Sequence, residues 1–200
     1  MREDSLVSAH PGTLFGTNFN RDLEVYLNLA SRMTLTGTNQ LWVADITYIR
    51  LQREFVYLAV ILDAFSRKVV GWALDQTLTS RLPVAALQQA IDQRQPMPNL
   101  VHHSDRGSQF TSFAYGLLLQ KQGIIPSMSA AGNCYDNAMK ESFFATLKTE
   151  CVVHPFATRA QARTAIFEYI EGFYNRQRLH SSLGYLSPEQ FEHLYYFPTL

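Results

Sequence analysis

The chain has 200 residues, of which 46% are hydrophobic and 12% aromatic, enough for one folded domain with its own core. Basic and acidic side chains balance at 17 each, which excludes a protein that binds nucleic acid through a large overall positive charge. The longest apolar stretch, residues 55–64, contains Asp63, and no apolar signal segment opens the chain. We therefore expect a cytoplasmic protein without a membrane span, in which Cys134 and Cys151 are free thiols.

In chain order, residues 1–38 are rich in Gly, Asn, Thr and Ser and predict a leader without a core, with one short helix around residues 22–32. Three β-rich runs follow, and the first two are apolar nearly throughout, which is typical of strands covered on both faces. Strands are predicted at 41–51, 54–65, 67–75, 99–105 and 124–129, and helices at 80–94, 112–123, 136–151 and 158–178. This order predicts an α/β fold with a mixed five-stranded sheet flanked by helices, and it resembles the order of the ribonuclease H-like fold.

Local signals mark several helix ends. Ser80 is a predicted N-cap, with Pro83 in the first turn that follows it. Gly123 is expected to stop the helix that precedes it, and the Ser187–Pro188 pair to start a last short helix.

Three acidic residues carry the functional argument, although each has an ordinary explanation when taken alone. Asp45 lies within an apolar strand, where an exposed position or a buried arginine would account for it. Asp105 ends a strand and begins a turn, which is common turn chemistry. Glu141 lies on a helix, where a lone Glu is usually a solvated charge. The same helix has a separate apolar stripe, predicted to be core, formed by Met139, Phe143 and Leu147.

Considered together, the three acids fall where one active site would need them: in mid-strand, at a neighbouring strand end, and on a helix that can pack across the sheet. Converging carboxylates repel one another unless cations lie between them, and hard oxygen ligands favour Mg²⁺ or Mn²⁺. Two such ions can support an in-line phosphoryl displacement on a nucleic acid.

Five segments resemble the bacterial insertion-sequence transposases of the DDE group, which have a retroviral-integrase-like catalytic core. The segments are NQLWVADITYI, LDAFSRKVVGWAL, HHSDRGSQFTS, SMSAAGNCYDNAMKESFFATLKTE and FYNRQRLHSSLGYLSPEQF. The resemblance covers roughly residues 38–195, and the 35 residues between Asp105 and Glu141 match the spacing that gives the "D, D(35), E" group its name. It implies a catalytic core at 39–195, after the leader at 1–38 and before a tail at 196–200.

Carried over residue by residue, the resemblance implies that Asp45, Asp105 and Glu141 are both the catalytic residues and the ligands of two Mg²⁺ or Mn²⁺ ions. It further implies that Lys148 contacts the transposon-end DNA. Asn137, beside Asp136 in the last motif, is expected to support the site on the DNA side.

Several other polar residues are expected near the DNA. Gln109, in the loop after the second Asp, is expected to position a phosphate or to cap the next helix, and Gly107 to permit the tight turn. Near the C-terminus, Arg176, Arg178 and His180 are expected either to contact phosphates or to hold the C-terminal turn.

Other motifs carry little weight. The His102–His103–Ser104–Asp105 run contains the letters of a hydrolase triad, but neighbouring residues on a strand point to opposite faces. The two histidines and Cys134 lack the spacing of a zinc site. No P-loop or Rossmann fingerprint is present in the sequence, so neither ATP nor NAD is implied.

The match departs from the family before the core. Family members carry helix-turn-helix material there, and residues 1–38 contain nothing of that type. We therefore expect the module that recognises the DNA ends to be missing, truncated or supplied by a separate helix-turn-helix polypeptide. We also expect the chain to form a homo-oligomer when assembled on DNA at the bacterial nucleoid. Two alternatives stay open: a ribonuclease H-like nuclease or resolvase that does no joining, and a catalytically silent DNA-binding or assembly protein.

Overall fold

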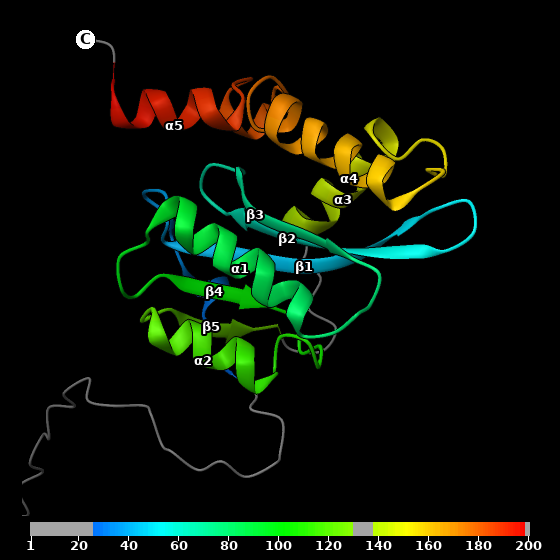
Figure 1. The fold of residues 1–200 in the computed structure, drawn as a ribbon. Helices are drawn as coiled ribbons and strands as arrows, with labels where there is room; N and C mark the ends of the chain where they lie inside the picture. The colour runs from blue at the N-terminus through cyan, green and yellow to red at the C-terminus, as the bar shows by residue number, and fades with distance from the viewer. Residues whose placement is uncertain (1–25, 130–137, 199–200) are drawn as a thin grey trace, which may run out of the picture.

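The computed structural model describes residues 26–129 and 138–198, and its centre is one five-stranded sheet (Figure 1). The strands are β1 (Leu41–Arg50), β2 (Phe55–Asp63), β3 (Val69–Asp75), β4 (Val101–Ser104) and β5 (Ile125–Met128). Their spatial order is β3-β2-β1-β4-β5. The first three strands form an antiparallel meander, whereas β4 pairs in parallel with both β1 and β5. The predicted mixed sheet is therefore confirmed.

Helices cover both faces of the sheet (Figure 1). They are α1 (Arg81–Arg94), α2 (Phe113–Lys121), α3 (Ala138–Glu150), α4 (Arg159–Phe167), the π-helix η2 (Glu168–Tyr174), the 3-10 turn η3 (Ser181–Leu183) and α5 (Pro188–Tyr196). None of the helices in the described part of the chain is long and apolar enough to cross a membrane.

Alternation along the strands divides the core into two layers. In β1, Trp42 and Ala44 face the layer that contains residues of α1 and α2, whereas Leu41 and Val43 face the layer of α3, α4 and the π-helix. Both faces of the sheet are thus buried, which explains why its strands are apolar nearly throughout. Gly71 allows α1 to lie close to β3, because a Cβ there would come within 2.3 Å of the Ala86 carbonyl oxygen.

The helices begin and end near the positions predicted from the sequence, but not all of the expected capping bonds are present. Ser80 precedes α1 but makes no side-chain capping bond, whereas Ser187 forms a complete capping box with Gln190. Gly123 follows α2 with φ +64°, as a stop signal should. The helix predicted at 158–178 is helical from Arg159 to Tyr174, but it changes from α4 to a π-helix at Glu168 and ends four residues earlier than expected.

The start of the described chain also differs from expectation. Of the helix expected around 22–32, the structure describes residues 26–32, and among these only the 3-10 turn η1 (Ala30–Arg32) is helical. Residues 22–25 lie outside the described residues. This segment is held against the sheet, because the Leu29 N–H donates to Ser127 Oγ at 2.9 Å. Met33 and Leu35 pack against the core layer of α3.

Candidate active site

The pairing of β1 with β4 brings the first two acids to one level of the sheet. The parallel register matches Val43 with His103, an offset of 60 residues, and the same offset brings Asp105 to the level of Asp45. Asp45 lies on the same face of β1 as Val43, which is the face covered by α3. Its side chain is partly buried there, and its Oδ1 accepts a hydrogen bond from the Ile46 N–H at 2.8 Å.

Asp105 is exposed and is held by its own turn, in which Oδ1 accepts the Gly107 N–H at 2.8 Å. Gly107 is needed for space, not for the backbone freedom that we expected, because its φ is not positive. A Cβ on Gly107 would lie 2.9 Å from Asp105 Oδ1 and 3.2 Å from Gln109 Oε1. Any larger residue would therefore push the Asp105 carboxylate away.

Glu141 lies in the first turn of α3 and is exposed. The helix is anchored beneath it, since Phe143 and Leu147 are buried in the core layer on the Asp45 face of the sheet. With Met139, which packs against the same layer, these two residues form the predicted apolar stripe, and they fix the height of Glu141 above β1.

The electrostatics of Asp45 show that the structure brings the three acids together. Burial raises the pKa of Asp45 above its ordinary value of 3.8. The charge of Lys140 and the hydrogen bond from Ile46 lower it, whereas the negative charges of Asp105 and Glu141 raise it. Within residues 26–129 and 138–198, however, no three His, Cys, Asp or Glu side chains are close enough to form a metal-binding group by themselves.

Lys140 is a site residue that the sequence analysis missed. It is 1% exposed, and its charge acts on both Asp45 and His102. The helical period contained a signal, because Lys140 shares the core-facing side of α3 with Phe144 and Leu147, four and seven residues later. The charge of Lys140 lowers the pKa of Asp45, although no ion pair joins the two side chains in the described part of the chain.

The residues expected beside the DNA are dispersed. Lys148 is exposed on α3, with its Nζ 4.9 Å from the centre of the Tyr48 ring. The Gln109 side chain donates to the Leu78 carbonyl at 3.4 Å and makes no capping bond to α2, whose N-cap is Ser112. Asn137, like Asp136, lies outside the described residues.

The three C-terminal residues do not join the carboxylates. Arg176 makes an exposed ion pair with Glu189 at 3.5 Å. Arg178 contacts both carboxylate oxygens of Glu150, at 3.1 and 3.0 Å. Arg178 and His180 line a pocket with Ser142 and other α3 residues, on a face of that helix turned away from Glu141.

The histidines of the His102–His103–Ser104–Asp105 run bond to hydroxyl groups in the core. His102 contacts the Tyr115 hydroxyl at 3.0 Å, and burial lowers its pKa to about 3. The ring nitrogens of His103 contact the hydroxyls of Ser127 and Ser129, both at 2.9 Å. Both histidines are therefore core residues with polar partners, and Cys134 lies outside the described residues.

Comparison with known proteins agrees with this geometry. Two family models described as integrase core domain match residues 36–134 and 141–194. The insertion element IS600 uncharacterized 31 kDa protein of Shigella sonnei is 44% identical over 182 residues, which are 90% of this chain and 67% of that protein. Transposase InsF for insertion sequence IS3A of Escherichia coli is 47% identical over 158 residues, which are 78% of this chain and 55% of that protein.

A solved structure extends the likeness to the fold. The HTLV-2 integrase catalytic core domain in complex with magnesium, in a trimeric form, superposes with a TM-score of 0.60 and 19% identity, over 79% of this chain and 99% of that one. The fold is thus that of an integrase core. The chain belongs to the family of bacterial insertion-sequence transposases that carry this core. It spans 55% to 67% of the length of the two relatives described above.

Proposed function

We propose that this chain is the catalytic core of a transposase that cuts DNA at the ends of an insertion sequence and joins the freed strands to other DNA. The observation that carries the proposal is the convergence of Asp45, Asp105 and Glu141 from β1, the end of β4 and α3, within electrostatic reach of one another. Membership of the transposase family supports it.

The carboxylates suit a divalent cation. Asp45 is partly buried beside two other carboxylates, and the only cation among the groups that shift its pKa is Lys140. Oxygen donors of this kind favour Mg²⁺ or Mn²⁺, and the HTLV-2 core was solved with magnesium. Because the described acids form no closed metal-binding group, we infer that DNA phosphate oxygens complete the sites of two ions. The bound ions would activate the attacking oxygen and neutralise charge on the leaving one.

The reaction consists of two phosphoryl displacements at one site. In the first, water attacks a phosphodiester at the end of the element, the bond from phosphorus to the 3′ oxygen breaks, and that oxygen takes up a proton. In the second, the new 3′ hydroxyl loses its proton and attacks a phosphodiester of the target, so that one strand is joined as another is cut. The protein contributes chiefly position and charge.

Individual residues have distinct parts in this proposal. Asp45, Asp105 and Glu141 would bind the metal ions, and the Gly107 N–H orients the Asp105 carboxylate. The buried Lys140 favours the charged form of Asp45. Exposed on the helix that carries Glu141, Lys148 contacts the end DNA. For Gln109, Asn137 and Arg176 a DNA contact stays a prediction.

Assembly is part of the same proposal. Two ends must be held together for transposition, so we expect a homo-oligomer on DNA; the HTLV-2 core was solved in a trimeric form. Recognition of the end sequence by a separate helix-turn-helix polypeptide, and association with the nucleoid, also stay predictions.

A product assay tests the function. The wild type, incubated with an end duplex, a target duplex and Mn²⁺, should yield joined strands. Asp45→Asn, Asp105→Asn and Glu141→Gln should each lower the yield by about a thousandfold or more without unfolding the protein. Glu189→Gln, in an exposed ion pair, is the matched acidic control and should keep its activity. Cleavage without joining would identify a nuclease instead. The absence of both cleaved and joined strands would identify a catalytically silent protein.

A metal titration tests the site separately. Calorimetric titration of Mn²⁺ into the wild type, with and without the end duplex, should show binding that disappears in the Asp45→Asn/Asp105→Asn double variant. Failure to bind metal even with DNA would overturn the assignment of the carboxylates.

A further inference from the structure

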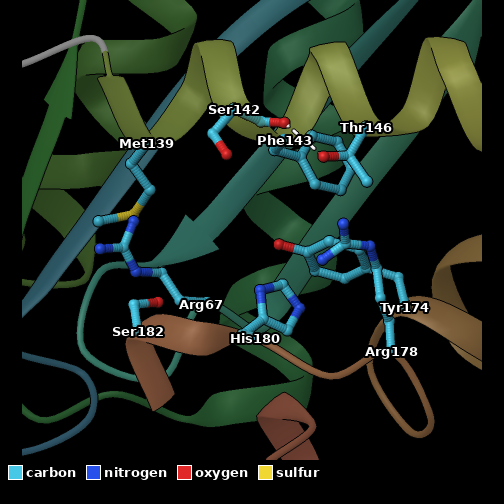
Figure 2. A pocket seen from close by; sticks show the side chains of 9 residues that line it. All are labelled: Arg67, Met139, Ser142, Phe143, Thr146, Tyr174, Arg178, His180 and Ser182. Carbon is cyan, nitrogen blue, oxygen red and sulfur yellow. Dashed lines mark hydrogen bonds between the residues drawn. The ribbon is translucent and has the colours of Figure 1, made fainter. Parts of the chain in front are cut away.

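A small polar cavity lies between α3, the β2–β3 turn and the chain that follows the π-helix (Figure 2). Its volume is about 60 Å³. A buried water needs roughly 10–15 Å³ of such space, so the cavity offers room for about four oxygen-sized atoms, the number in a phosphate group. Its mouth includes Ser142 and Ser182, both exposed, so a group on a larger molecule can enter.

The lining consists of hydrogen-bond donors. Hydroxyl groups come from Ser142, Tyr174 and Ser182, and from Thr146, whose hydroxyl already donates to the Ser142 carbonyl at 2.8 Å. Nitrogen donors come from Arg67, Arg178 and His180, and the rest of the wall is apolar. None of the described residues that line the cavity is Asp or Glu. A wall of this kind matches a ligand that only accepts hydrogen bonds.

Arg67 supplies a positive charge that no described residue neutralises through an ion pair. It makes no ion pair with any residue that the structure describes, whereas Arg178 is paired with Glu150 at 3.0 Å. Arg67 lies in the tight turn between β2 and β3 with φ +63°, a conformation that side-chain-bearing residues seldom adopt. The turn thereby presents the guanidinium to the cavity (Figure 2).

His180 supplies a second polar group, a ring nitrogen without a hydrogen-bond partner among the described residues. Its Nε2 is buried and has no hydrogen-bond partner among the described residues. Burial, followed by the charges of Arg178 and Arg67, lowers the pKa of His180 to about 4, against a smaller opposing effect of Glu150. The ring is therefore neutral at pH 7 and keeps one N–H to donate.

We propose that this cavity is a phosphate-binding site that holds one phosphodiester group of bound DNA, apart from the phosphate that reacts. Ser142 and Thr146 line it from the helix that carries Glu141 and Lys148, so α3 would contact DNA on two faces. A chain of zero net charge needs such local cation sites to hold DNA. The inference rests on the proposed function, although the same chemistry would accept a free phosphate ion.

The experiment measures binding of a fluorescent end duplex by anisotropy, at salt concentrations from about 50 to 200 mM. Arg67→Gln should weaken binding by about tenfold and lower the salt slope by about one. Arg67→Lys is the matched control that keeps the charge, and should keep the slope. Ser142→Asp, which puts a carboxylate at the mouth without changing the turn, should weaken binding like Arg67→Gln. Melting temperatures show that each variant is folded.

Inorganic phosphate, titrated into the DNA-free protein and followed through the NMR signals of the His180 ring, separates the sources. Phosphate binding that Arg67→Gln removes, together with the reduced slope, supports the proposal. An unchanged slope despite phosphate binding overturns the assignment to DNA and leaves a site for the free ion. An unchanged slope without phosphate binding overturns both. If the wild type binds no DNA, the proposed function fails, and the phosphate titration alone decides whether the cavity is an oxyanion site.

Discussion

Two groups of acidic side chains lie around the sheet of this protein, and their partners differ. Asp63 and Glu192 are almost completely buried where the β2–β3 turn, α1 and α5 meet. Arg94 donates two hydrogen bonds to Glu192, both at 2.8 Å, and lies 3.8 Å from Asp63. Lys68 adds a contact to Glu192 at 3.3 Å. We call this group the Arg94 network.

The proposed catalytic group, which consists of Asp45, Asp105 and Glu141, has more negative than positive charge around it. Asp45 is affected by two carboxylates and by the single cation Lys140, and its pKa is raised by burial and by those carboxylates. Burial alone would raise the pKa of Glu192 too, but the hydrogen bonds and charge of Arg94 lower it. The pKa of Asp63 is raised, mainly by burial, so the contrast with Asp45 is that of Glu192. Burial of an acid therefore does not by itself identify its role. An acid whose negative charge is paired with a cation of the protein stabilises the fold. An acid without enough neighbouring positive charge can bind a cationic ligand.

The largest effect on stability should come from removing the cation of the Arg94 network. Arg94→Met leaves two buried carboxylates with Lys68 alone, and should lower the free energy of unfolding by about 3–5 kcal/mol. Asp45→Asn should leave it unchanged or raise it, because it removes a poorly compensated charge. Urea titration of the metal-free proteins at pH 7 measures both.

Arg176→Met is the matched control for that comparison, because the Arg176–Glu189 pair is exposed and should contribute less than about 1 kcal/mol. If Arg94→Met costs no more than this control, the Arg94 network does not stabilise the fold, and the contrast with the catalytic group fails.

A smaller effect, confined to catalysis, is expected at Gly107. Gly107→Ala places a Cβ within 2.9 Å of Asp105 Oδ1 and should shift that carboxylate. Strand-transfer activity should fall roughly 10- to 100-fold, since misplacements of about 1 Å have costs of that order. Stability should change little, because Asp105 is exposed and its movement opens no cavity.

Gly116→Ala provides the comparison for Gly107→Ala. Gly116 lies in α2, and nothing lies within 4 Å of a Cβ built there. That variant should keep full activity and gain about 0.5–1 kcal/mol of stability from its better helix propensity. Equal activity in the two variants would mean that the position of Asp105 does not limit catalysis.

The sequence predicted the sheet and the three acids because their signals are local. Apolar runs, a strand end and a helical stripe each occupy a few adjacent residues, and the fold brings them together. Contacts between distant segments left no such trace: Glu192 meets Arg94 across 98 residues, and Ser66 across 126.

The same limit explains the two local errors in the site. Gly107 was interpreted from its residue type, whereas the reason for it is the position of the Asp105 side chain. Lys140 was missed because its burial, and the effect of its charge on Asp45, arise only when α3 packs against β1. Both depend on tertiary contacts that one-dimensional spacing does not contain.

The smallest predicted effect is the most direct test of the contrast, because Asp45 and Glu192 should respond to pH with opposite sign. Asp45 has a raised pKa in the folded protein, so the stability it contributes is present at low pH and is lost as pH rises above its ordinary value of 3.8. Asp45→Asn should therefore be more stable than the wild type at pH 7 without metal, and the gap should close as pH falls. Glu192 has a lowered pKa, so its contribution is present above 4.5 and is lost as pH falls further. Glu192→Gln should be less stable than the wild type at neutral pH, again with a closing gap. Urea titrations across this pH range measure both gaps; gaps of the same sign would show that Asp45 is a structural acid like Glu192.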